Sequence, residues 1–327
     1  MKLRPLLCLF AAPLFALLSL IATTGASALP PTSDQFDDLT IGGTQLYVPP
    51  SVAPSPVIAS LQIILDRRGF SPGVIDGRDT ARFRTALETY NRLHPDEVLN
   101  PAQMPVTDTP FFTDYTITAQ DVAGPFTPKL PPLYIHQASL AFLGFRDAHE
   151  MLAERFHIDE DYLQTLNPDA DFSAVGTTIR VPDVGRYLQK RVARIEADKG
   201  ALQVRAYDSQ GALIAAYPAS IGSAATPSPV GTHTVRNKAQ DPAYTYDPKG
   251  SAQPGLASGL VLLPPGPNGP VGNAWIGLSK RTYGIHGTPE PSEIGITASV
   301  GCVRLTNWDA LELAVMVRRG VEVTFIE

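Results

Sequence analysis

The stretch SVGCVRLTN at residues 299–307 is the most informative part of the sequence, because it contains Cys302, which has no cysteine partner once an export signal is removed. The chain has two cysteines, and the other, Cys8, lies in a segment with the features of a removable export signal. A single thiol in an oxidising compartment is either an inert buried residue or a reactive group. Upstream, the stretch GIHGT at 284–288 supplies His286 as a candidate base.

Residues 1–28 are predicted to be a secretory signal peptide. The segment begins with two basic residues, continues through an apolar stretch at 6–22 and ends with the small residues ASA at 26–28. The alternative is an uncleaved membrane anchor, but the apolar stretch is short and is interrupted by Pro13. We therefore expect the protein in the periplasm or at the cell exterior.

The composition limits the range of functions. The net charge is -6, and no tract rich in lysine and arginine is present, so nucleic-acid binding has no electrostatic basis. At 327 residues, the chain can form two or three domains. Many of the 31 prolines cluster between apolar periodic segments, which indicates Pro-rich linkers at 29–56 and 96–132.

A small helical unit is predicted over residues 57–95. Apolar residues recur at helical spacing from Ile58 to Leu65, and Gly69 ends that helix. Thr80 can cap a second helix with an apolar face. The pair LQ at 61–62, the stretch GFSPGVIDG at 69–77 and a late aromatic resemble the small helical peptidoglycan-binding domain family. Within that stretch, the Asp-Gly pair at 76–77 is interpreted as a turn.

A second small unit is predicted over residues 133–184, in the order strand, helix, helix, strand. Tyr134-Ile135 is the expected first strand, and Asp147 and Asp159 can each cap a helix. The stretches LAERF at 152–156, LNP at 166–168 and IRVP at 179–182 make the unit similar to the LysM module, which binds glycans containing N-acetylglucosamine. His149 and His157 are interpreted as surface helix residues.

The region from 190 to 327 is predicted to be β-rich. Residues 202–207 and 213–217 alternate at period two around a hairpin signal, and a late helix precedes a strand at 321–325. The predicted fold class is multidomain α+β, with a β-sandwich-like C-terminal domain and two small N-terminal modules.

The chemistry expected of the cysteine depends on its surroundings. A free thiol has a pKa of about 8.5, and an adjacent imidazole can hold it as a thiolate–imidazolium pair. By strand alternation, Arg304 lies on the same side as Cys302 and could lower the thiol pKa or hold a substrate carboxylate. The amides after Gly301 could donate to an oxyanion. The alternatives are a buried inert cysteine, and a zinc site for which only two ligands are at hand.

The two stretches together resemble the signature of the L,D-transpeptidase (YkuD-type) catalytic domain. The matching segments are GIHGT, then IG at 294–295, and then SVGCVRLTN followed by Asp309. Segments upstream, TP at 226–227 and LPPGPN at 263–268, match as well. The resemblance spans about 190–327. Many family members have histidine where Val300 stands, and we expect activity to survive this difference.

The resemblance implies a cysteine acyltransferase without metal or cofactor. Cys302 would attack the peptidoglycan stem peptide after its third residue and release D-alanine, with His286 as general base and the carbonyl of Gly287 orienting the imidazole. Ser299 and Gly301 would line the anion pocket.

In this scheme Arg304 and Tyr283 would contact substrate, and Trp275 could form a further wall of the groove. The expected partners are peptidoglycan stem peptides and glycan strands, with a diaminopimelate amine or an anchored lipoprotein as acceptor. The alternatives are a hydrolytic L,D-carboxypeptidase or endopeptidase with water as acceptor, and a non-catalytic wall-binding protein.

Overall fold

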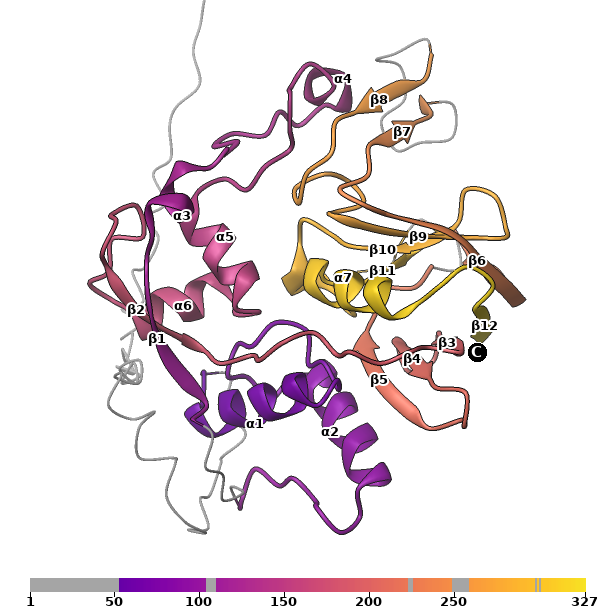
Figure 1. Cartoon of the computed structure of the whole chain (residues 1–327), viewed down its shortest axis with the longest axis horizontal. Coiled ribbons are helices and arrows are strands. Elements are labelled where there is room, and N and C mark those ends of the chain that lie inside the picture. Colours follow the sequence, from indigo (N-terminus) through magenta and orange to yellow (C-terminus); the bar gives the residue numbers. More distant parts are fainter. Residues whose placement is uncertain (1–52, 104–109, 223–225, 249–258, 298, 300) are drawn as a thin grey trace, which may run out of the picture.

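The computed structural model describes residues 53–103, 110–222, 226–248, 259–297, 299 and 301–327 (Figure 1). The predicted signal peptide and nearly all of the first predicted linker lie outside these residues, as does Val300. In the described ranges, no helix has the length and apolar character needed to cross a bilayer.

The helical unit consists of α1 (Pro56–Arg67) and α2 (Ala81–Leu93). Proline stands at the start of α1, where its missing N–H costs nothing, and the Thr80 hydroxyl caps α2 by accepting from the Phe83 amide. Gln62 accepts hydrogen bonds from the amides of Asp76 and Gly77, at 3.1 and 2.8 Å, and donates to the Asp76 carboxylate. The Asp-Gly pair therefore forms an internally bonded turn.

The second unit has two helices, α5 (Ala148–Arg155) and α6 (Glu160–Leu166), and the expected caps are confirmed. The Asp147 side chain accepts from the Glu150 amide, and the Asp159 side chain accepts from the Tyr162 amide. Strand β2 (Thr178–Pro182) follows and pairs antiparallel with β1 (Phe112–Thr116). A short helix, α3 (Ala119–Ala123), comes after β1.

The prediction of a strand at Tyr134-Ile135 is wrong. These residues begin helix α4 (Tyr134–Gln137), and the strand that pairs with β2 lies earlier, within the segment 96–132 predicted to be a linker. The Tyr134 ring packs edge-on against Tyr246 with 4.8 Å between the ring centroids, in a small core separate from that of the second unit. Tertiary packing therefore decided the conformation of this segment.

The C-terminal region is β-rich, as predicted. One eight-stranded sheet has the order β11-β10-β9-β6-β12-β3-β4-β5, and a two-stranded hairpin, β7–β8, projects from it (Figure 1). The strands and the single long helix of this region are β3 (Arg194–Asp198), β4 (Gln203–Tyr207), β5 (Leu213–Pro218), β6 (Gly231–Gln240), β7 (Tyr244–Tyr246), β8 (Val261–Leu263), β9 (Ala274–Leu278), β10 (Gly284–His286), β11 (Val303–Arg304), α7 (Asn307–Met316) and β12 (Glu322–Ile326).

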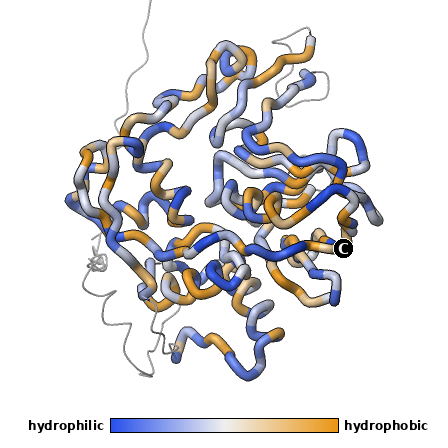
Figure 2. Tube along the Cα trace, in the orientation of Figure 1, coloured by the Kyte–Doolittle hydropathy of each residue, from blue (hydrophilic) through white to orange (hydrophobic). Residues whose placement is uncertain are grey.

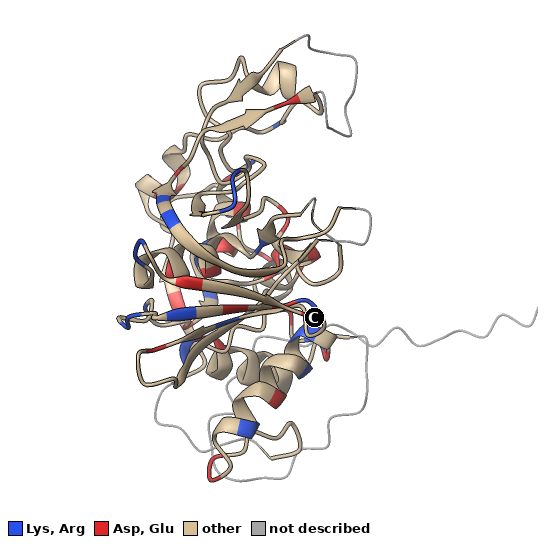
Figure 3. Cartoon of the chain, turned by 90° about the vertical axis from the view of Figure 1, so that its right-hand side faces the viewer, with Lys and Arg blue, Asp and Glu red and all other residues tan. Residues whose placement is uncertain are grey.

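In place of the expected β-sandwich, the structure has one sheet, and strand β6 changes its pairing partner along its length. The first part of β6 pairs with β12, and the second part pairs with β9 after an irregularity between Val235 and Asn237. Both halves of the sheet and α7 contribute to one apolar core, and hydrophobic and hydrophilic residues alternate along the strands (Figure 2). Acidic and basic residues are interspersed over the sheet (Figure 3).

The helical unit packs directly on the edge of this sheet. The Ser71 amide donates to the Ala216 carbonyl at 2.9 Å, and the Ala216 amide donates to the Gly69 carbonyl at 2.8 Å, so the turn after α1 covers edge strand β5. The Ser71 hydroxyl also donates to Asp309 of α7 at 2.9 Å. Burial raises the pKa of the Asp309 carboxyl far above its usual range.

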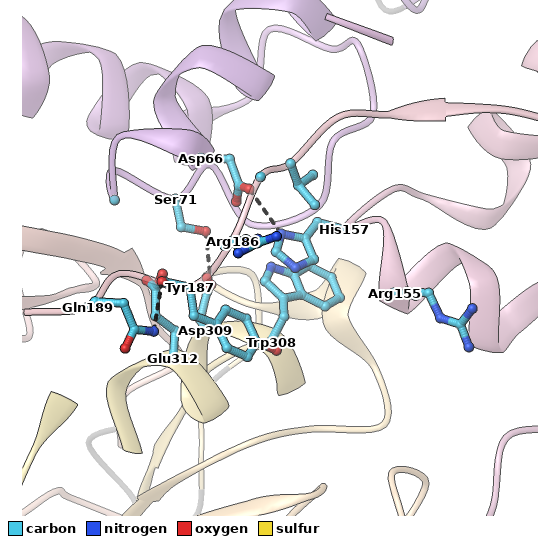
Figure 4. A pocket seen from close by; sticks show the side chains of 13 residues that line it. Asp66, Ser71, Arg155, His157, Arg186, Tyr187, Gln189, Trp308, Asp309 and Glu312 are labelled. Atoms are coloured by element: carbon cyan, nitrogen blue, oxygen red, sulfur yellow. Dashed lines mark hydrogen bonds and ion pairs between the residues drawn. The ribbon is translucent and has the colours of Figure 1, made fainter. Parts of the chain in front are cut away.

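All three parts of the chain meet at a cavity of about 410 Å³ (Figure 4). His157 lies here, and the prediction that it is a surface helix residue is wrong. Its ring lies 3.0 Å from the Asp66 carboxylate and stacks on Trp308 with 5.0 Å between centroids. His149 also packs inward, because its ring stacks on Phe172 at 4.2 Å. The contact between His157 and Asp66 and the stacking on Trp308 thus link the three parts of the chain.

Candidate active site

Two short parallel strands bring the predicted catalytic residues together. In the register of β10 and β11, Ile285 lies opposite Val303 and His286 lies opposite Arg304. Cys302 immediately precedes β11 and therefore lies beside Gly284, whose amide bonds to it. Because side chains alternate between the faces of a sheet, Cys302, His286 and Arg304 share one face.

His286 is held in one orientation. Its Nδ1 lies 2.7 Å from the Gly287 carbonyl oxygen, which can only accept, so Nδ1 carries the proton and the Nε2 lone pair remains available. The imidazole stacks on Trp275 with 5.7 Å between centroids, and His286 is 5% exposed. Burial, reinforced by the nearby charge of Arg304, lowers the pKa of His286 to about 4. The imidazole is therefore neutral at physiological pH.

Cys302 is partly buried, and its thiol lies at the end of β10. The Sγ atom donates to the Thr282 carbonyl at 3.6 Å. Burial raises the pKa of the Cys302 thiol, and the hydrogen bond from the Gly284 amide only partly counteracts this. Both shifts disfavour the expected thiolate–imidazolium pair, because burial penalises each of the two charges.

A tight turn before Cys302 sets the direction of the thiol. Gly301 has φ +96°, a conformation that favours glycine, and a Cβ there would lie 3.0 Å from the Tyr283 ring. The Ser299 hydroxyl donates to the Cys302 carbonyl. In this arrangement the Ser299 hydroxyl bonds to the backbone of Cys302, whereas the family resemblance implied that Ser299 lines an anion pocket.

Sequence reasoning missed a serine behind this turn. The Ser228 hydroxyl donates to the Gly301 carbonyl at 2.8 Å and accepts from the Gly222 amide at 2.9 Å. Thr226, two residues earlier, donates from its hydroxyl to the Ser299 carbonyl at 3.1 Å. The TP segment at 226–227 was a motif match that could have directed attention to these hydroxyls.

The side chain of Arg304 points toward the segment that follows His286. Its guanidinium donates to the Thr297 hydroxyl at 2.9 Å and to the Thr297 carbonyl at 3.3 Å. Its electrostatic effect falls on the pKa of His286, which it lowers, whereas the sequence suggested an effect on the thiol. Tyr283 lies against Gly301, and Lys280 lies 4.6 Å above its ring.

A cavity of about 500 Å³ reaches residues that contact Cys302 and His286, although these two residues do not line it themselves. Thr282 and Trp275, which contact Cys302 and His286 respectively, line it together with Tyr244 of the β7–β8 hairpin. Most of the lining is apolar, which suits a cleft that binds a ligand through a few polar groups. Within the described ranges, no group of three His, Cys, Asp or Glu residues could hold a metal ion.

The family model of the L,D-transpeptidase catalytic domain matches residues 193–325. A relative described as a putative L,D-transpeptidase YkuD, from Bacillus licheniformis, is 31% identical over 177 residues, which cover 54% of this chain and 91% of the relative. The chain belongs to the L,D-transpeptidase family. Its C-terminal region is thus a catalytic domain of the peptidoglycan cross-linking cysteine acyltransferases.

Further L,D-transpeptidases resemble smaller parts of the chain. The putative enzyme YkuD of Bacillus subtilis is 34% identical over 33% of this chain and 51% of its own length, and the probable enzyme YbiS of Escherichia coli is 28% identical over 54% and 60%. Crystallised L,D-transpeptidase 3 of Mycobacterium tuberculosis aligns with 47% of this chain and 76% of its own, with 18% identity and a TM-score of 0.34. The family model begins at residue 193, so the resemblances of the two N-terminal units remain predictions.

Proposed function

We propose that the protein is an exported peptidoglycan L,D-transpeptidase in which Cys302 is the nucleophile and His286 the general base. The hydrogen bond from His286 Nδ1 to the Gly287 carbonyl carries this proposal, because it leaves Nε2 free to accept a proton on the face shared with the thiol. The donor is a stem peptide whose third residue is linked to a terminal D-alanine.

In the acylation step, Cys302 Sγ attacks the carbonyl carbon of the third stem residue, and the thiol proton passes to His286 Nε2. The bond from that carbon to the D-alanine nitrogen then breaks, and the departing nitrogen takes the proton from His286. Because burial disfavours both the thiolate and the imidazolium, we propose that proton transfer accompanies the attack instead of preceding it. The product is a thioester on Cys302.

In the transfer step, an acceptor amine attacks the thioester carbonyl and gives its proton to His286, and the sulfur leaves and is reprotonated. With a diaminopimelate amine as acceptor the product is a 3→3 cross-link, and with a lipoprotein side chain it is an anchored protein. The amides of Gly301 and Cys302 are proposed donors to the developing oxyanion. The two N-terminal units are proposed to hold the enzyme on the wall, and 1–28 to direct it to the periplasm.

The test is product analysis on purified muropeptides with a tetrapeptide stem. The wild-type protein is expected to release D-alanine and form dimers, and Cys302→Ala is expected to do neither. Tripeptide products without dimers would show that water is the acceptor, and therefore replace transfer by hydrolysis. If the wild-type and Cys302→Ala proteins are equally inactive and both sediment with sacculi, the result favours a non-catalytic wall-binding protein.

A further inference from the structure

Helix α5 of the second unit reaches a residue next to the catalytic strands. The Asn307 side-chain amide, at the start of α7, donates to both carboxylate oxygens of Glu154 at 3.0 Å. The two residues are separated by 153 positions in the chain, and Asn307 is 1% exposed. Each residue lies in a separate motif of the sequence, Glu154 in LAERF at 152–156 and Asn307 in SVGCVRLTN at 299–307, and the fold brings the two motifs into contact.

Asn307 lies in a slot between two glycines. A Cβ placed on Gly287 would be 2.1 Å from Asn307 Oδ1, and one on Gly272 would be 2.0 Å from it. The same Oδ1 accepts from the Asn273 amide at 3.3 Å, and Nδ2 also donates to the Pro267 carbonyl at 3.2 Å. The oxygen side of the Asn307 amide therefore packs closely against the Cα of Gly287 and leaves no room for a side chain there.

Gly287 is in turn the residue that orients the imidazole, through its carbonyl at 2.7 Å from His286 Nδ1. Nδ2 donates to Glu154 and to the Pro267 carbonyl, and Oδ1 accepts from the Asn273 amide, so these contacts together hold the Asn307 amide with its oxygen side toward Gly287. The contacts thus run from Glu154 to Asn307, then to the Gly287 peptide, and finally to His286.

We propose that Glu154 is a positioning residue for His286 and acts through Asn307 and Gly287. The second unit is then part of the catalytic framework in addition to any role in wall binding. This inference rests on the proposed role of His286 as base. Burial raises the pKa of Glu154 to about 8, and the neighbouring Glu150 and Glu160 raise it further, so the double hydrogen bond from Asn307 offsets an unfavourable placement.

The same helix provides a matched control. Glu150, one turn earlier on α5, accepts a hydrogen bond from Asn268 Nδ2 at 2.9 Å. Like the bond between Asn307 and Glu154, this bond joins an asparagine amide of the C-terminal region to a glutamate of α5. Asn268, however, is not among the atoms nearest to Gly287. Loss of the Glu150 bond weakens the seating of α5 without releasing the Gly287 peptide.

The experiment compares the full-length wild type with Glu154→Ala, Glu154→Gln and Glu150→Ala. Three properties are measured: the ¹⁵N shifts of the His286 ring, the kinetics of acylation by imipenem and the melting temperature. Glu154→Ala is expected to lose the single Nδ1-protonated tautomer. Its maximal acylation rate should fall about tenfold, with little change in the half-saturating imipenem concentration. Glu154→Gln keeps one acceptor oxygen and should recover most of the rate.

Glu150→Ala is expected to melt at a lower temperature but to keep the wild-type tautomer and acylation rate. The inference is overturned if Glu154→Ala behaves in the same way. If Glu154→Ala does not fold, Glu154→Asp replaces it, because the shorter side chain keeps the carboxyl group but withdraws it from Asn307. A wild type that imipenem does not acylate would contradict the proposed function, and the ¹⁵N shifts alone would then decide the positioning role.

Discussion

His286 and Arg304 are direct register partners on the parallel strands β10 and β11. The arrangement places a fixed positive charge beside the imidazole that is proposed to accept the thiol proton. Burial is the larger cause of the low pKa of His286, and the Arg304 charge adds to it. A protonated imidazole cannot act as a base, so this charge keeps the base functional in acidic surroundings.

Replacement of Arg304 by glutamine is expected to raise the pKa of His286, because the repulsion between two positive charges is removed. The measurement is an NMR titration of the His286 ring, with Arg304→Lys as the control that retains the charge. An unchanged or lower pKa in Arg304→Gln would contradict this electrostatic role.

The pH dependence of thiol reactivity separates a neutral resting pair from an ion pair. Burial raises the thiol pKa, so the thiol is mainly protonated at neutral pH. Below this pKa, each increase of one pH unit raises the thiolate fraction about tenfold. The rate of alkylation of Cys302 by iodoacetamide should therefore climb steadily between about pH 6 and pH 8. A rate that is already constant across this range would show that an imidazolium stabilises the thiolate.

Substitution of Gly287 by alanine is expected to reduce both stability and acylation. The added Cβ would lie 2.1 Å from Asn307 Oδ1, so the buried amide must move, at a cost of about 1–3 kcal/mol. Unfolding in urea measures the loss. Gly200→Ala is the control, since a Cβ there would lie 3.5 Å from its nearest atoms. An equal loss of stability in the two variants would argue against close packing of Asn307 on Gly287.

Removal of Arg82 is expected to loosen the segment after His286. Arg82 of α2 donates to the carbonyls of Ser292 and Ile294, and its side chain is 9% exposed. Arg82→Ala leaves both acceptors without this donor and should destabilise the protein by about 1–3 kcal/mol.

Limited proteolysis should detect earlier cleavage near 289–297 in Arg82→Ala. The control is Arg84→Ala on the same helix, because the Arg84 side chain is 60% exposed and pairs with Asp79 of the same helical unit. Cleavage that is equally fast in both variants would contradict a specific hold on this segment.

Local patterns predicted the features that depend on neighbouring residues. The two helix caps at Asp147 and Asp159, the turn at Asp76 and the strands around Cys302 all follow from short stretches of sequence. The family resemblance identified the catalytic region, and the match to residues 193–325 agrees with it.

Features that depend on distant residues could not be predicted. The helix at Tyr134 depends on Tyr246, the position of His157 depends on Asp66 and Trp308, and the Asn307 amide is oriented by Glu154. The pKa shifts of Cys302 and His286 could not be predicted either, because they follow from burial that many separate segments create.

The most direct test of the proposed chemistry is peptide mapping after incubation with imipenem. If Cys302 is the nucleophile, the wild-type protein gains one covalent adduct, on the peptide that contains residues 299–307, and Cys302→Ala gains none. An adduct on another residue, or one that persists in Cys302→Ala, would contradict the assignment of Cys302 and His286 as the catalytic pair.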